Sequence, residues 1–109
     1  MKPPRIGALR HRIVLETSIR AADGGGGASV TWTPVAEIWA AVSPRSGSEQ
    51  SGAEAVSGRV SHQIIVRHRG DIEPALRFRF GARVFEILAV LDIDERRRLL
   101  NCLCREELL

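Results

Sequence analysis

Residues 76–90 read LRFRFGARVFEILAV, and this stretch decides the fold class. In its first part, LRFRF, large apolar side chains alternate with arginines, which is the two-residue period of a half-buried strand. One face of this strand is therefore expected to pack into a core and the other to point outward. The inward residues are Leu76, Phe78 and Phe80, and the outward residues are Arg77 and Arg79.

A second strand follows in the same stretch. Gly81 turns the chain into RVFEILAVLDI, where Phe85 and Ile87 begin one face. Val90 falls on the opposite parity, so we expect a bulge near Leu88 and Ala89. The stretch therefore predicts two adjoining strands rather than a helix.

Four further segments of the chain are also strand-like, and DIDE at residues 92–95 is predicted to be a polar turn. Pro34 lies inside one of the segments and indicates a bulge, an edge position or a break there. In another, Glu16 is expected on the outward face, opposite Ile13 and Leu15. The segments are RHRIVLETSI (10–19), VTWTPVAEIWAAVS (30–43), HQIIVRHR (62–69) and RRRLLNCLCREE (96–107).

Six short strands without a strong helical period predict an all-β fold, either an antiparallel barrel or a sandwich. A small antiparallel β-barrel is favoured because closure removes exposed strand edges. Gly24–Gly27 is expected to be a flexible hairpin connection. Residues 46–60 are expected to form a flexible insert between the second and third strand regions, either a long loop or a short helix.

Length and composition set the class of protein. The 109 residues predict one domain, 1–109, with 44% apolar and 27% charged residues, as in ordinary globular proteins. No window has the apolar length of a membrane span, and the N-terminus lacks the apolar run of a signal peptide, so we expect a cytoplasmic site of synthesis. The net charge of +3 is too small to indicate a partner.

Residues that could carry catalysis or bind metal are few. His62 and His68 could join Cys102 and Cys104 in a metal site, but C-x-C lacks the usual zinc spacing, so reduced, half-buried thiols and strand-end histidines are favoured. A magnesium site built from the acidic residues of DIDE is possible, but a polar turn uses the same residues without an ion. We therefore predict no enzyme activity, no cofactor and no metal.

Arginines form the largest set of charged residues. Arg67 and Arg69 share one face of their strand, Arg77 and Arg79 share one face of theirs, and residues 96–98 are RRR, so a basic groove for phosphates is possible. The chain has no Tyr, and five aromatic residues occupy positions that the pattern assigns to the core: Trp32, Trp39, Phe78, Phe80 and Phe85. Without aromatic platforms a solvated or protein-facing surface is favoured, and a small basic β-barrel that binds nucleic acid stays the alternative.

The order of these features resembles the phage head-tail joining proteins, also called head closure, stopper or head-tail adaptor proteins, and their gene transfer agent counterparts. The resemblance covers nearly the whole chain. At His68 the sequence departs from the family, which more often has an aromatic residue there. The motifs that carry the resemblance are RHRIVLE (10–16), the Gly-rich hairpin followed by Trp32, WAAVSPRSGSE (39–49), IIVRHRGDI (64–72) and FEILAV (85–90).

The resemblance implies a structural protein of the virion or phage-like particle, assembled in the host cytoplasm. Its copies would form a ring at the head-tail junction, between a portal or adaptor ring above and a tail terminator or tail tube below. The ring would close the DNA exit channel, with only weak contact to the DNA that passes, and dock the tail. No membrane is implied.

A ring also gives the insert a purpose. Its apolar side chains are too small to offset the roughly 1–2 kcal/mol of backbone entropy lost per ordered residue. We therefore expect residues 47–58 to be mobile in the free subunit and ordered by neighbours in the particle. The candidate assembly interface comprises Arg45, Glu49, Glu54, Arg59, Arg67 and Arg69.

Overall fold

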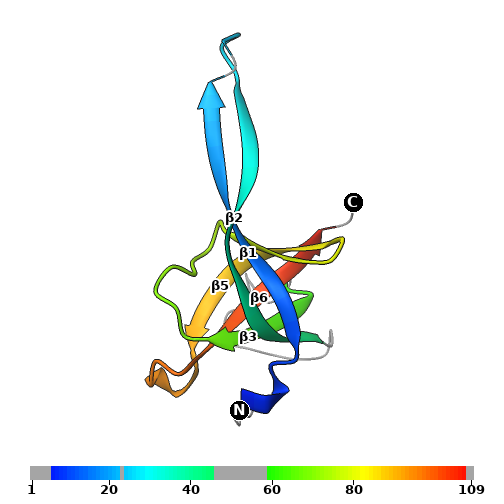
Figure 1. The fold of residues 1–109 in the computed structure, drawn as a ribbon, viewed down its shortest axis with the longest axis vertical. Helices are drawn as coiled ribbons and strands as arrows, with labels where there is room; N and C mark the ends of the chain where they lie inside the picture. Colours follow the sequence, from blue (N-terminus) through cyan, green and yellow to red (C-terminus); the bar gives the residue numbers. More distant parts are fainter. Residues whose placement is uncertain (1–5, 23, 46–58, 108–109) are drawn as a thin grey trace.

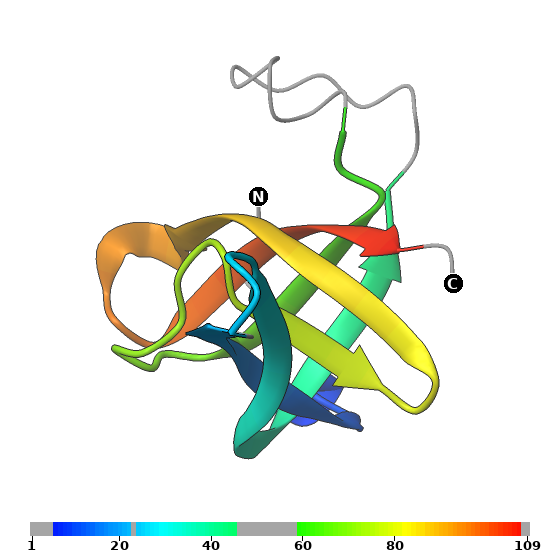
Figure 2. The ribbon, with the colours of Figure 1, turned by 90° about the horizontal axis from the view of Figure 1, so that it is seen from above.

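The computed structural model describes residues 6–22, 24–45 and 59–107, and these form a closed barrel of six antiparallel strands (Figures 1 and 2). Around the barrel the strands follow the order β1-β2-β3-β6-β5-β4, and β4 pairs with β1. The predicted antiparallel barrel is therefore confirmed. The strands are β1 (His11–Ala22), β2 (Ala28–Pro44), β3 (His62–Arg67), β4 (Arg77–Phe80), β5 (Arg83–Asp92) and β6 (Leu99–Glu107).

Two short 3-10 turns flank the strands. The first, η1 (Ile6–Ala8), precedes β1, and the second, η2 (Ile93–Glu95), joins β5 to β6 where a polar turn was predicted. No α-helix occurs among the described residues, and no helix there is long and apolar enough to cross a membrane.

The hairpin of β1 and β2 is much longer than the barrel needs. Its far part rises from the barrel as a two-stranded arm (Figure 1). The arm begins where β1 leaves its second neighbour, because β1 pairs with β4 only over Val14–Glu16. At its tip Gly24 and Gly26 have φ of +82° and +86°, a conformation that glycine adopts without strain. The predicted glycine hairpin is therefore the connection of this arm.

Both predicted irregularities are present as β-bulges. In β2, Leu15 pairs with Ala36 and Glu16 with Pro34, so Val35 is the extra residue beside the proline. In β5, the pairing partners of Ile87 and Ala89 are consecutive residues of β6, so Leu88 is the extra residue. Pro34 bends β2 without ending it, and β2 continues as one strand of 17 residues.

The barrel interior is filled by alternate residues of every strand. Phe78 and Phe85 are its largest fully buried side chains, and Phe80 packs against them from a partly buried position. The assignment of Trp32 and Trp39 to the core was wrong. Ala40 takes the inward position on β2, so its neighbour Trp39 points outward and is 52% exposed, while Trp32 lies half-buried on the arm.

A second, smaller cluster covers the outside of the barrel. Ile64 and Val66 point inward, so Ile65 between them points outward, where Leu9 and Leu99 pack on it. Ala41 and Ile93 pack against this cluster. The chain before β1 and the turn after β5 thereby shield one wall of the barrel from solvent.

Candidate functional site

The arm is joined to the barrel by a buried carboxylate. Glu16 points outward, as predicted, yet its side chain is 0% exposed because two arginines of β4 cover it. Arg77 Nε and Arg79 Nη2 each donate a hydrogen bond of 2.7 Å to it, one to each carboxylate oxygen. The Arg77 guanidinium also lies 4.2 Å from the ring centre of Trp32 on the arm. We call Glu16, Arg77, Arg79 and Trp32 the seam clamp.

The seam clamp removes two arginines from the predicted basic groove. Arg77 and Arg79 occupy the outward face of β4, but their guanidinium groups bind Glu16, so much of their charge is neutralised. Sequence reasoning missed this site because Arg77 lies 61 residues from Glu16 in the chain. The sequence does show a carboxylate, Glu16, within a strand of an arginine-rich protein. No local pattern identifies which arginine this carboxylate binds.

Arg67 and Arg69 lie together beside the exposed tryptophan. With Trp39 and His68 they line a pocket of about 330 Å³, although β3 ends at Arg67 and Arg69 belongs to the following loop. Arg69 donates two hydrogen bonds of 2.9 Å to Asp71, which lower the pKa of that carboxyl. Arg67 is exposed and makes no ion pair or side-chain hydrogen bond within the described parts of the chain.

Trp39 is also held from its other side. Arg12 on β1 lies with its guanidinium carbon 5.4 Å from the Trp39 ring centre and forms an ion pair with Glu37. We call Trp39, Arg12, Arg67 and Arg69 the tryptophan patch. It combines an exposed apolar ring with arginines, so an aromatic platform exists where none was predicted.

The remaining candidate interface residues lie elsewhere. Arg45 follows β2, and its backbone N–H donates a 2.9 Å hydrogen bond to the Ser61 carbonyl just before β3. Arg59 is exposed on the same connection. These residues are at the start of β3, whereas Arg67 is at its end, so the structure separates the two sets. Glu49 and Glu54, with residues 46–58 of the insert, lie outside the described residues.

The proposed histidine and cysteine ligands are not brought together. His62 pairs across the sheet with Cys104, but His68 lies beyond the other end of β3. Burial raises the pKa of Cys102 to about 12 and raises that of Cys104 further, which disfavours the thiolates that bind metal. Among the described residues no group of three metal ligands occurs. Both thiols are fully buried rather than half-buried.

His62 belongs to a small polar cluster at the barrel rim. Its Nδ1 is 2.9 Å from Ser61 Oγ, and its ring packs edge-on against Phe85 at 5.0 Å. Burial lowers the pKa of His62, although the nearby Glu106 opposes this. Arg83 binds Glu106 through hydrogen bonds of 2.8 and 3.0 Å. The cluster closes one end of the barrel wall.

The acidic turn stabilises its own backbone. Both carboxylate oxygens of Asp92 lie 3.2 Å from the backbone N–H of Arg97, which donates to them. This is the role expected of a polar turn. Asp94 and Glu95 are exposed beyond it.

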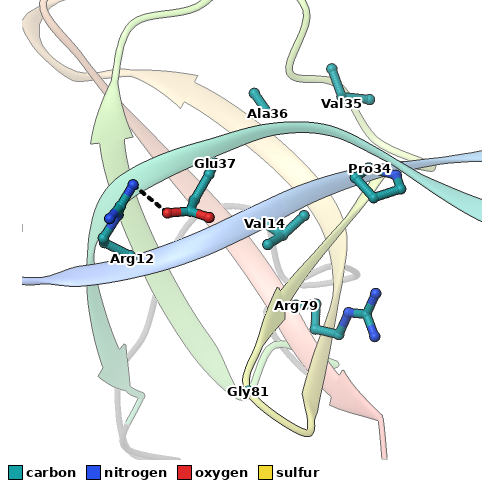
Figure 3. A pocket seen from close by; sticks show the side chains of 8 residues that line it. All are labelled: Arg12, Val14, Pro34, Val35, Ala36, Glu37, Arg79 and Gly81. Atoms are coloured by element: carbon teal, nitrogen blue, oxygen red, sulfur yellow. Dashed lines mark ion pairs between the residues drawn. The ribbon is translucent and has the colours of Figure 1, made fainter.

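A surface hollow of about 610 Å³ lies beside the bulge of β2 (Figure 3). Pro34, Val35 and Val14 line it with the Arg12–Glu37 ion pair, and Arg79 lies on its opposite side. Its lining residues include no Ser, Cys or His, and the Glu37 carboxylate is paired.

Comparison with known proteins gives consistent results. The family model described as phage head completion protein matches residues 4–107. A chain from the structure of the virion of native gene transfer agent (GTA) particle is 38% identical, with a TM-score of 0.71 over 97% of this chain and 98% of that one. The solution structure of protein SF1141 from Shigella flexneri 2a is 31% identical, with a TM-score of 0.68 over 94% and 96%. No match was found among the curated proteins compared.

Proposed function

The chain belongs to the phage head completion protein family, and we propose that its copies form a ring at the head-tail interface that closes the DNA exit channel and docks the tail. Membership makes it a structural component of a virion, located at head closure, as the resemblance implied. The observation that carries the proposal is the family match over residues 4–107 together with the likeness to the gene transfer agent chain.

The shape of the subunit supports assembly through the projecting arm and exposed side chains rather than through pairing of strand edges on the barrel. A closed barrel offers few free strand edges for pairing with another chain. The arm extends beyond the barrel and carries two exposed apolar side chains, Ile19 and Val30. Exposed apolar groups on a projecting element are typical of surfaces that a partner covers. The arm is therefore a candidate contact with the ring above or the tail below.

The candidate partners are other virion proteins. They comprise further copies of this chain, a portal or adaptor ring above, and a tail terminator or tail tube below. The interface we propose uses Arg45, Glu49, Glu54, Arg59, Arg67 and Arg69. Of the two arginines beside Trp39, Arg67 is the more available to a partner, because Arg69 already binds Asp71.

A protein partner fits the tryptophan patch better than nucleic acid does. Exposed Trp39 beside arginines supports base stacking and phosphate contact, which favours the alternative function. However, Glu37 pairs with Arg12 and Asp71 pairs with Arg69, so two of the three arginines carry a carboxylate beside them. Those carboxylates would repel a phosphate backbone. We therefore propose only weak contact with the DNA that passes through the channel, and no catalytic role.

Electron microscopy of particles tests this function directly. A strain lacking the gene is complemented with the full-length chain, and particles are purified and reconstructed. We expect a ring of barrels at the head-tail junction, and in the null strain heads without joined tails that lose DNA. Particles in which the chain occurs elsewhere, or null particles with normal tails and full heads, would contradict the proposal.

A further inference from the structure

The arm has two backbone edges that no strand of the same subunit covers. Beyond Glu16, β1 pairs only with β2, and β2 begins to pair with β3 only at Ala40. Among the described residues, the arm segments 17–22 and 28–33 therefore have a neighbouring strand on one side only. A two-stranded ribbon is at best marginally stable in water by itself. Further strands at its edges would stabilise the arm.

The alternation of the backbone identifies the groups that face outward from the arm. Ile87 N donates a 3.2 Å hydrogen bond to the Leu76 carbonyl, so this carbonyl faces β5 and the next residue, Arg77, faces β1. Its partner Glu16 faces β4 in return, and every second residue of β1 continues on that side. Their partners on β2 also face outward, because the two residues of an antiparallel pair either face each other or both face away. The outward N–H and C=O groups belong to Ser18, Arg20 and Ala22 on one edge and to Ala28, Val30 and Trp32 on the other.

Neither edge carries the features that usually keep exposed strands from pairing. Natural proteins protect such edges with lysines, prolines, bulges or a covering segment. Residues 17–22 and 28–33 contain no Lys and no Pro, and Arg20 is their only charged residue. Pro34 and the bulge at Val35 lie below these segments, at the base of the arm. The two edges are therefore suited to pairing with strands of another molecule.

We propose that the arms of neighbouring copies pair edge to edge, with β1 of one arm beside β2 of the next. This inference rests on the proposed ring and names a contact between its subunits. All arms of a cyclic ring point in the same direction along its axis, whereas β1 and β2 run in opposite directions within each arm. A β1 edge therefore meets a β2 edge antiparallel, which is the more stable ladder geometry. Because the contact joins two different edges, its repetition generates a ring when the rotation closes.

A second copy is the partner that these edges fit. Each edge presents three outward residues at a spacing of two, so the N–H and C=O groups of one edge match those of the other. The Arg20 side chains of successive copies lie two strands apart, about 10 Å, which exceeds the Debye length of about 8 Å at physiological ionic strength. Their repulsion is therefore largely screened. The faces of the arm, which carry the exposed Ile19 and Val30, stay available to the ring above or the tail below.

The pairing also determines where the arms lie relative to the ring axis. Neighbouring strands are about 4.8 Å apart, so each arm occupies about 10 Å of circumference. The arm extends along the long axis of the subunit (Figure 1), and the subunit measures 28 × 26 Å across that axis. Barrels that lie side by side occupy a wider circle than the paired arms. The arms therefore converge toward the ring axis.

Disulfide trapping between two co-expressed chains tests the contact. One chain carries Val30→Cys and the other carries Ser18→Cys, Arg20→Cys or Ala22→Cys in turn, which covers the level register and offsets of two residues either way. Separate chains are used because Arg20 and Val30 are paired within one arm, and both native cysteines are buried. Mild oxidation of purified mixed particles should give a covalent dimer of the two chains in one of the three mixtures. The matched controls are particles that contain only one of the variant chains, and these should give no dimer.

The outcomes separate the contact from the proposed function. If both chains are present in the particles and no mixture gives a dimer, the contact is overturned and the proposed function stands. Dimers in the single-chain controls, or a disulfide to a different particle protein, also overturn the contact. A chain absent from wild-type particles overturns the proposed function itself.

Proline substitution gives an independent readout. Arg20→Pro removes an outward N–H, whereas the matched control Arg20→Ala removes the same charge and keeps the N–H. This N–H has no backbone partner in the described subunit, so circular dichroism of both free variants should match wild type. Arg20→Pro should lower the yield of tailed particles at least about tenfold relative to Arg20→Ala. Ala22→Pro repeats the comparison against wild type at the next outward position. Equal yields in both comparisons overturn the proposal.

Discussion

The carboxylate of Glu16 is fully buried beneath Arg77, whose Nε donates a 2.7 Å hydrogen bond to it across the seam between β1 and β4. This pair joins the first strand of the chain to the fourth at the point where the arm leaves the barrel. The same Arg77 stacks on Trp32 of the arm. One guanidinium therefore links barrel closure to the position of the arm.

Glu16→Gln should destabilise the protein by about 2 kcal/mol, because two arginines then face a neutral group at a site closed to water. This value is below the 3–5 kcal/mol usual for a broken buried pair because Arg79 is half exposed and solvent screens its charge. Urea unfolding measures the change. The control is Glu86→Gln, which breaks the exposed ion pair with Arg105 and should cost under about 1 kcal/mol. Equal losses in both variants would contradict a special role for the seam clamp.

The two thiols should be inert in the folded protein and should make stability decrease at high pH. Burial raises the pKa of Cys102 from 9.0 to about 12, so the unfolded chain releases this proton before the folded protein does. The free energy of unfolding should therefore fall as pH rises above about 9. The chain has no Tyr and Lys2 is its only lysine, so few other groups titrate there.

Urea unfolding between pH 8 and pH 11 measures this decrease, and a Cys102→Ala/Cys104→Ala variant should show a flatter profile. A thiol reagent at pH 8 should modify the native protein only after denaturant is added, whereas a His68→Cys variant should react at once. Rapid reaction of the native thiols would show that the barrel wall opens readily.

Reversing the charge of both Arg67 and Arg69 should block particle assembly without unfolding the subunit. Arg67 makes no ion pair in the described chain, and the Arg69–Asp71 pair is largely exposed, so the stability change should stay under about 1 kcal/mol. Circular dichroism and thermal melting check the fold, and particle yield in a complemented null strain checks assembly. If the double variant were unfolded, these arginines would be required for the fold of the subunit and not for an interface.

Replacing residues 47–58 with a short Gly-Ser link should preserve the barrel and abolish head-tail joining. The strands on either side already meet, because Pro44 pairs with His62 and Arg45 binds Ser61 through the backbone. Circular dichroism should therefore be unchanged. Limited proteolysis of the free wild-type protein should cut first in this segment or at Gly24–Gly27. Wild-type particle titres with the shortened chain would show that the insert has no assembly role.

The isolated protein should bind duplex DNA only weakly, with dissociation constants near the nonspecific range of about 10⁻⁴–10⁻⁶ M. A channel that lets DNA pass cannot hold it tightly, and carboxylates accompany most of the arginines around Trp39. Fluorescence anisotropy of a labelled duplex at two salt concentrations measures this. Tight binding that falls steeply with salt would instead support the nucleic-acid-binding barrel.

Alternation was enough to predict the barrel strands, because one face of each strand is buried. The parity slip at Val90 correctly predicted the bulge at Leu88, and Pro34 correctly marked the bulge at Val35. Both signals are local, since a bulge shifts the apolar pattern within its own strand. The extent of the arm was not predictable, because Ile19 and Val30 continue the strand pattern whether or not a core faces them.

The sites were harder to predict because they depend on pairs distant in sequence. Trp39 was assigned to the core by the strand pattern, yet the small neighbour Ala40 occupies the inward position. Arg67 and Arg69 were correctly placed on one surface, since they are two positions apart on a strand pattern. Whether this surface belongs to an assembly interface stays a prediction, because an interface depends on a second molecule that no single sequence pattern identifies.

The seam between β1 and β4 also bears on how the barrel forms and opens. Only three residue pairs, Val14–Glu16 with Arg79–Arg77, close the ring of strands there, fewer than in any other ladder of the described barrel. Its residues are far apart in the chain, so loop-closure entropy disfavours early formation of this ladder during folding. In the native state a short ladder is the natural starting point of local opening, so we expect amide protons there to exchange before those of β3 and β6. We therefore expect the barrel to open first at the β1–β4 ladder, beside the base of the arm.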